Sequence, residues 1–180
     1  YGFASSNNQN YNKVIVIGAG GCVPTLGVVA RSGCDKQLDI AIDYIKKTDS
    51  IKLVLLSGFS GDLGLKEGII SSNKYINGYK NTVEKLQSID KKVIFVIDTP
   101  SFKNSNVPEF CAPHLLPFRS YFHDYPDFCS GLKNADLHPN KLYGKFVSQL
   151  SEVTKNVLFY DPNKHLCSNG NCKLFHENKL

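Results

Sequence analysis

The sequence predicts a doubly wound α/β fold, in which a mostly parallel sheet is flanked by helices. Two observations predict it. Four short apolar runs have the composition of buried strands, at residues 13–17, 51–56, 92–97 and 157–160. Between them lie segments with apolar residues three and four positions apart, which is the spacing of amphipathic helices. Because parallel neighbours need crossover connections, this alternation favours a parallel sheet.

The expected strands are uniformly apolar, whereas the expected helices are apolar on one side only. The first strand, Lys13-Val-Ile-Val-Ile17, ends at Gly18, and the last is Val157-Leu-Phe-Tyr160. The apolar stripes of the helices run from Leu38 to Ile45, from Tyr75 to Leu86 and from Leu142 to Val153.

The stretch from Thr99 to Pro139 departs from this rhythm. It is rich in proline and aromatic residues and contains Cys111 and Cys129. A loop of about 40 residues is uncommon in a compact domain unless it is functional or cross-linked. We therefore expect a long Pro/Cys-rich loop at the carboxyl end of a strand, where open α/β sheets bind ligands.

Length and composition fit one domain over residues 1–180, with 42% apolar and 21% charged residues. The chain lacks methionine and begins at Tyr1, so we expect a processed or excised segment and a truncated domain. No run approaches the roughly 20 apolar residues of a spanning helix, so any membrane attachment is expected outside the chain. The formal charge of +5 comes from dispersed basic residues, which is typical of a solvated surface, and no nucleic-acid partner is expected.

Six cysteines form three local couples, namely Cys22 with Cys34, Cys111 with Cys129, and Cys167 with Cys172. Many pairings are possible, and three short-range disulfides are the simplest arrangement. Zinc binding by thiolates is the alternative. The chain has no C-x-x-C motif, and polar turn residues fill the shortest interval. We therefore expect disulfides, an oxidising compartment, and neither a metal nor a cofactor.

The glycines after the first expected strand resemble the dinucleotide fingerprint G-x-G-x-x-G. Gly18 and Gly20 fit it, but Val23 stands where the third glycine would allow close helix–strand packing. Pro24 interrupts the helix that should follow. A nucleotide-binding Rossmann domain is therefore kept only as an alternative.

Residues 57–61 follow the second expected strand and resemble the nucleophile elbow G-x-S-x-G. Asp62 stands where the last glycine is required, and Gly64 and Gly68 interrupt the helix that should follow. We interpret the segment as a loop.

Histidines and aspartates are the residues of base-assisted nucleophilic catalysis. No spacing among them fixes a triad or a metal site, and the adjacent His123 and Asp124 would point apart on a regular element. We expect surface or loop roles for each histidine. The residues considered are His114, His123, His138, His165, His176, Asp98, Asp124, Asp127, Asp136 and Asp161.

Taken in order, several blocks resemble one known family. The blocks are C-x-P-x-L from Cys22 to Leu26, the strand ending in Ser57-Gly58, the strand ending in Asp98-Thr-Pro100, and Asp161-Pro162 leading to Cys167 and Cys172. They resemble the SGNH domain fused to acyltransferase-3 type membrane proteins, which modify O-antigen, peptidoglycan or other surface glycans. The resemblance covers residues 13–175.

The resemblance implies an SGNH, flavodoxin-like three-layer fold and serine-based acyl transfer or ester hydrolysis. That family carries its serine in a G-D-S-H block and its Asp-His pair in a D-x-x-H block, and neither block is in this chain. We expect them just before Tyr1 and beyond Leu180, so the segment alone is expected to contain no catalytic residue and to be inactive. It would supply oxyanion-hole donors at Gly20 or Gly21 and at Ser57–Gly58, where typical hydrolase relatives carry asparagine.

The resulting hypothesis is part of an extracytoplasmic domain of a glycan O-acyltransferase. The parent would use an acyl donor and a glycan acceptor, and an N-terminal membrane acyltransferase domain would tether it at the periplasmic or extracellular face. The alternative is a non-catalytic carbohydrate-binding module, in which the aromatic residues from Phe118 to Tyr125 would stack on sugar rings.

Overall fold

The computed structural model describes residues 14–18, 20–28, 32–58, 63, 71–99, 132–133, 141–168 and 171–172. In chain order its elements are α1 (Cys34–Lys47), β1 (Leu53–Leu56), α2 (Ser71–Gln87), β2 (Lys92–Val96), β3 (Leu132–Lys133), α4 (Lys141–Val153), β4 (Val157–Tyr160), α5 (Asn163–Leu166), β5 (Cys167–Ser168) and β6 (Asn171–Cys172).

The larger sheet is parallel and has β2 at its centre, in the order β1-β2-β4. Its three strands are the second, third and fourth apolar runs of the sequence. The register places Leu55, Ile94 and Leu158 side by side across the sheet. A parallel sheet with flanking helices confirms the predicted α/β class.

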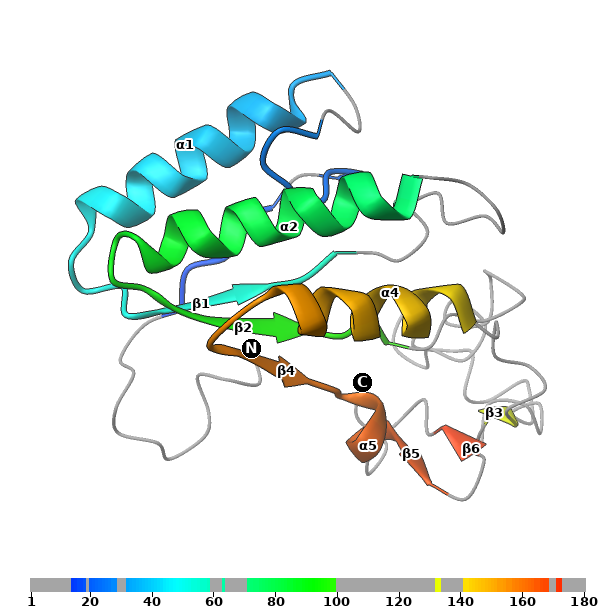
Figure 1. The fold of residues 1–180 in the computed structure, drawn as a ribbon. Coiled ribbons are helices and arrows are strands. Elements are labelled where there is room, and N and C mark those ends of the chain that lie inside the picture. The colour runs from blue at the N-terminus through cyan, green and yellow to red at the C-terminus, as the bar shows by residue number, and fades with distance from the viewer. Residues whose placement is uncertain are drawn as a thin grey trace, which may run out of the picture.

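The helices α1, α2 and α4 lie on one side of this sheet (Figure 1). Each contains the amphipathic stripe that predicted it, and α2 contacts both β2 and α4. A second helical layer on the opposite side is not among the described residues, so that part of the three-layer arrangement stays a prediction.

An aromatic cluster joins α2, β2 and α4 between the helices and the sheet face that they cover. The ring of Tyr79 meets Phe95 edge-on at 5.3 Å and Phe146 at 5.9 Å between centroids. All three side chains are about 1% exposed. Such rings each bury a large apolar area, so this cluster is the centre of the core.

The first expected strand is not formed. Residues 14–18 have no regular secondary structure and pair with no described strand, and Val16 is 88% exposed. A strand is stabilised by a hydrogen-bonded neighbour and by burial, and this apolar run has neither in the described part of the chain. The prediction of a buried strand at 13–17 is therefore wrong for this structure.

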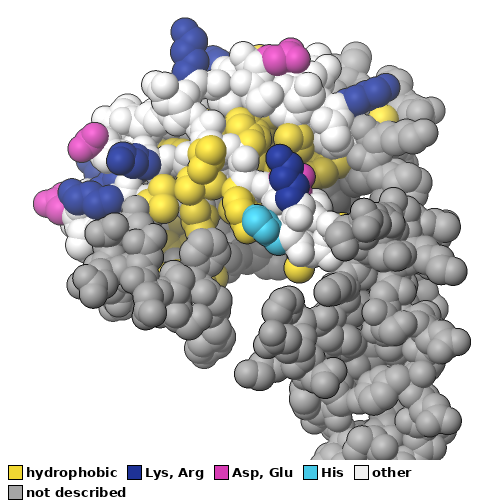
Figure 2. Space-filling view, turned by 90° about the horizontal axis from the view of Figure 1, so that it is seen from below, with side chains coloured by type: hydrophobic (Ala, Val, Ile, Leu, Met, Phe, Trp, Pro, Cys, Tyr) yellow, Lys and Arg dark blue, Asp and Glu magenta, His cyan; other side chains and the backbone are white. Residues whose placement is uncertain are grey.

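The other side of the sheet is apolar and lacks a described helix. Leu55 is 39% exposed, Leu158 is 62% exposed and Tyr160 is 39% exposed, although all three lie on strands. Figure 2 shows apolar side chains gathered on this side of the molecule. Period-two alternation explains the pattern, because neighbours such as Phe95 point to the helices and are buried.

A second, smaller sheet was not expected from the sequence. Its strands β3, β6 and β5 are antiparallel, and Cys167 lies directly opposite Cys172. Its strand β3 falls within the expected Pro/Cys-rich loop of residues 99–139, and the rest of that loop beyond Thr99 lies outside the described residues. Among the helices that the structure describes, none combines the length and the apolar character needed to span a membrane.

Truncating the aromatic cluster should destabilise the domain strongly. Phe146→Ala removes a buried ring and leaves a cavity, so we expect a loss of about 3–5 kcal/mol in the free energy of unfolding. Urea denaturation followed by circular dichroism measures it. Leu158→Ala is the matched control, and at 62% exposure it should cost less than about 1 kcal/mol. Equal losses for the two variants would contradict the packing described here.

Candidate functional site

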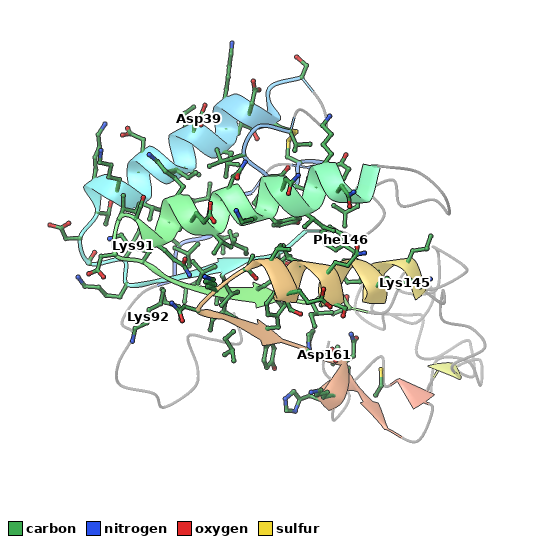
Figure 3. All side chains as sticks on the ribbon, in the orientation of Figure 1. Asp39, Lys91, Lys92, Lys145, Phe146 and Asp161 are labelled. Atoms are coloured by element: carbon green, nitrogen blue, oxygen red, sulfur yellow. A yellow bond between two sulfur atoms is a disulfide. The ribbon has the colours of Figure 1, made fainter. Side chains whose placement is uncertain are left out.

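The carboxyl ends of the parallel strands gather at one edge of the sheet. Ser57 and Gly58 follow β1, Asp98 follows β2 and Asp161 follows β4. Figure 3 shows Asp161 at this end of the sheet and Lys92, at the start of β2, at the opposite end. Ligands of open α/β sheets bind at the carboxyl edge, so the candidate site lies here.

At this edge, Gly58 lies against the loop that continues from Gly20 and Gly21. The assignment of Gly20, Gly21, Ser57 and Gly58 to an oxyanion hole stays a prediction. A Cβ atom added to Gly58 would lie 3.3 Å from Val23 Cγ1 and 3.6 Å from Pro24 Cδ. Val23 and Pro24 come after Gly21 and Cys22 in the chain, so the segment that packs against Gly58 is the continuation of the Gly20–Gly21 turn. Gly21 has φ +71°, in the left-handed region that favours glycine.

The loop that follows Gly21 is anchored to α2. The backbone N–H of Leu26 donates to Thr82 Oγ1 at 2.9 Å and to the Gly78 carbonyl at 3.2 Å. The Thr82 hydroxyl donates in turn to the Gly78 carbonyl at 2.9 Å, and Thr82 is fully buried. Because the buried Thr82 hydroxyl both accepts and donates a hydrogen bond, it holds the loop against α2.

A disulfide between Cys22 and Cys34 holds the same loop to the first residue of α1. This is one of the three couples expected from the sequence. Cys167 is disulfide-bonded as well. Cys111 and Cys129 lie outside the described residues, so their couple stays a prediction.

Removing the first disulfide should loosen this loop and destabilise the fold. Its cysteines are 12 positions apart, and closing a ring of that length in the unfolded chain is worth about 3 kcal/mol. We expect the double variant Cys22→Ser/Cys34→Ser to lose about that much in the free energy of unfolding, measured by urea denaturation. Wild-type protein in reductant serves as the comparison, and an unchanged midpoint in both samples would contradict the prediction.

Polar groups converge where β2 and β4 end. The backbone N–H of Asp98 donates to the Tyr143 hydroxyl at 3.1 Å, and Asn163 Nδ2 donates to the Asp98 carbonyl at 3.1 Å. The backbone N–H of Asn163 donates to Asp161 Oδ1 at 3.0 Å. Asn163 Oδ1 is buried and has no hydrogen-bond partner, and it is alone in this among the described side chains. The network ties the end of β2 to α4 and to α5.

The Tyr143 hydroxyl is held in its neutral form. Burial raises the pKa of Tyr143 to about 12, the hydrogen bond from the Asp98 N–H partly opposes this rise, and the negative charges of Asp98 and Asp161 add to it. The neutral phenol is therefore the form that the fold accommodates.

Stability should fall in alkaline solution because of this tyrosine. The folded pKa lies above the ordinary value of 10.0, so the contribution is fully present below pH 10 and is lost as pH rises through about 12. The expected loss is on the order of 1–2 kcal/mol after a discount for solvent screening. Urea denaturation between pH 9 and 12 measures it.

Tyr143→Phe is the control for this pH dependence. The free energy of unfolding of this variant should not show the part of the alkaline decrease that comes from Tyr143. At pH 7 the variant should be about 0.5–1.5 kcal/mol less stable than the wild type, because the Asp98 N–H loses the Tyr143 hydroxyl as acceptor. Identical pH profiles for the two proteins would contradict the assignment.

Of the histidines, the structure describes His165. It is exposed and stacks on Tyr160 with 5.9 Å between ring centroids. His114, His123, His138 and His176 lie outside the described residues, as do Asp124, Asp127 and Asp136. Within the described ranges, no group of three or more His, Cys, Asp or Glu side chains is placed to hold a metal ion.

The residues that pack behind this edge carry no distinctive signal in the sequence. Tyr79 and Thr82 fall within the apolar stripe from Tyr75 to Leu86, and Tyr143 lies beside the stripe that begins at Leu142. Asn163 could have been found, because an aspartate two residues before it, at the end of a strand, is a common signal for a side-chain-to-backbone turn. Ser60 of the elbow-like segment lies outside the described residues.

The structure also bears on the dinucleotide alternative. That fold opens a helix at the glycine loop, so that the pyrophosphate sits at the helix N-terminus. Here the chain makes turns from Gly20 to Val28, and the next described helix begins only at Cys34. Among the described residues, no helix therefore begins at this glycine loop.

The described residues form a parallel α/β sheet with helices packed on it, which is the class of fold to which SGNH domains belong. A family model for the SGNH domain fused to AT3 domains matches residues 1–180. The chain belongs to this family of acyltransferase-associated SGNH domains.

One solved structure shows the same fold, the periplasmic domain of a lipopolysaccharide acetyltransferase from Salmonella ser. Paratyphi A. The TM-score is 0.57 at 16% sequence identity, and the match covers 88% of this chain. The chain spans 57% of the length of that structure. None of the curated proteins matches the chain.

Proposed function

We propose that this chain is part of an extracytoplasmic SGNH domain of a glycan O-acyltransferase, with O-antigen, peptidoglycan or a similar surface glycan as acceptor. The observation that carries the proposal is the close approach of Gly58 to Val23 and Pro24, in the loop that continues from Gly20 and Gly21. In a chain of the SGNH family, this approach supports the proposal that both segments supply donors to one oxyanion hole.

The proposed chemistry is a two-step transfer. A serine Oγ bonds to the acyl carbonyl carbon, and a histidine takes its proton while an aspartate orients the imidazole. The bond between the acyl carbon and the donor breaks, and the histidine returns the proton to the departing group. A glycan hydroxyl, or water in ester hydrolysis, then gives its proton to the histidine and bonds to the acyl carbon, while the bond to the serine Oγ breaks and the serine regains the proton. Backbone N–H groups at Gly20 or Gly21 and at Ser57 or Gly58 would stabilise the negative oxygen in both steps.

The serine and the Asp-His pair are proposed to lie in polypeptide flanking this chain. The open apolar side of the sheet supports this, because Leu158 and Leu55 would gain free energy from a covering layer. The apolar residues 14–18 support it too, since no strand in the described part of the chain pairs with them or buries them. The isolated chain is therefore expected to be inactive.

We place the domain at the periplasmic or extracellular face, tethered by a membrane acyltransferase domain. The fusion to AT3 domains in this family supports the tether. The solved structure with the same fold is described as a periplasmic domain of a lipopolysaccharide acetyltransferase. The disulfide between Cys22 and Cys34 also favours an oxidising compartment.

The test is acyl transfer by the full-length parent protein. Replacing the serine of an upstream G-D-S-H block with alanine should abolish acylation of the surface glycan, because no nucleophile remains. Mass spectrometry of the released glycan measures the acyl groups, and membrane abundance of the variant is the control for folding.

Full acylation by a stable serine variant would overturn the proposal. So would a parent gene that encodes neither the serine block nor the D-x-x-H block. Binding of the glycan by such a protein, without turnover, would instead favour the carbohydrate-binding alternative.

A further inference from the structure

One side chain of α2 lies directly behind the Ser57–Gly58 turn. A Cβ atom added to Gly58 would lie 2.7 Å from Tyr79 Oη, closer than real Cβ contacts allow. The Tyr79 ring is 1% exposed and is wedged between Phe95 and Phe146. Since the ring cannot swing aside, any strain at Gly58 is transmitted to the backbone of the turn.

The preceding residue of α2, Gly78, lies close to the loop that continues from Gly20 and Gly21. A Cβ atom added to Gly78 would lie 2.8 Å from both Thr25 Cβ and Val28 Cγ2. Both neighbours are buried and β-branched, so they have little freedom to move. The Gly78 carbonyl also accepts the hydrogen bond from the Leu26 N–H.

We propose that Gly78 and Tyr79 are positioning residues that set the spacing between the Gly20–Gly21 block and the Ser57–Gly58 turn. One rigid helix meets Gly58 through Tyr79 and meets Thr25 and Val28, in the loop that continues from Gly21, through Gly78. A change at either contact would therefore move one segment relative to the other. Both residues are buried and act through the turns. The inference rests on the proposed function, because it assigns the two blocks to an oxyanion hole.

The effect should appear in turnover rather than in substrate binding. Donors of an oxyanion hole act where charge develops in the transition state, and a misplacement of about 1 Å can cost on the order of 100-fold in rate. Losing an interaction made only in the transition state lowers kcat and leaves KM unchanged.

The test is a double-mutant cycle in the full-length protein. Gly58→Ala places a methyl group against Tyr79 Oη and should lower kcat about 10-fold to 100-fold, with KM for the acyl donor unchanged. Tyr79→Phe removes that oxygen atom. In the Tyr79→Phe background, Gly58→Ala should therefore lower kcat by less than about threefold.

Gly144→Ala is the matched control, because a Cβ atom there meets nothing within 4 Å and α4 is far from the two blocks in sequence. Its kcat should equal that of the wild type. In Gly78→Ala the added methyl group would clash with Thr25 and Val28, so this variant should lower kcat as Gly58→Ala does. If Gly58→Ala fails to fold, the double variant and Gly78→Ala carry the test.

A merely structural role would lower the melting temperature while leaving kcat per folded molecule unchanged, and that result would overturn the inference. Equal effects of Gly58→Ala in both backgrounds would also overturn it. The serine variant separates the two proposals. If wild-type acylation depends on that serine but kcat is insensitive to Gly58 and Gly78, the positioning role alone fails. If acylation is independent of the serine, the proposed function fails.

Discussion

The packing of Tyr79 between Phe95 and Phe146 is the interaction on which the rest of the structure depends. It joins the middle helix, the central strand and the last long helix in one buried contact. The same tyrosine ends in a hydroxyl that lies behind Gly58. The core and the candidate site are therefore not separate parts, because the side chain that fills the first also limits the geometry of the second.

At the other side of the edge, the ends of β2 and β4 are joined by polar groups instead of rings. Asn163 connects the Asp98 carbonyl with the Asp161 carboxylate, and Tyr143 receives the Asp98 N–H. A strand that leaves a sheet must satisfy its last backbone groups, and here side chains of α4 and α5 do so. At this edge, aromatic side chains pack next to Gly58, whereas hydrogen bonds hold the chain at Asp98.

The sequence predicted the regular elements well because their signals are local. The apolar runs at 51–56, 92–97 and 157–160 and the helical stripes between them correspond to β1, β2, β4, α1, α2 and α4. The run at 13–17 carries the same local signal, but pairing and burial depend on a neighbour that no local pattern encodes. A resemblance alone points to Gly20, Gly21, Ser57 and Gly58, and the approach of Gly58 to Val23 and Pro24 arises from tertiary packing against α2. Tyr79 could not be found in advance, since a buried tyrosine in an amphipathic stripe has the same pattern whether or not its hydroxyl reaches a turn.

The row formed by Leu55, Ile94 and Leu158 has a thermodynamic consequence. Aliphatic side chains on a solvated sheet surface add nothing to stability until another polypeptide excludes water from them. A layer that covered this row would gain free energy together with the strands beneath it, and the two layers would then unfold together. Damage to such a layer would reach β2, and through Phe95 and Tyr79 it would reach Gly58 at the carboxyl edge of the sheet.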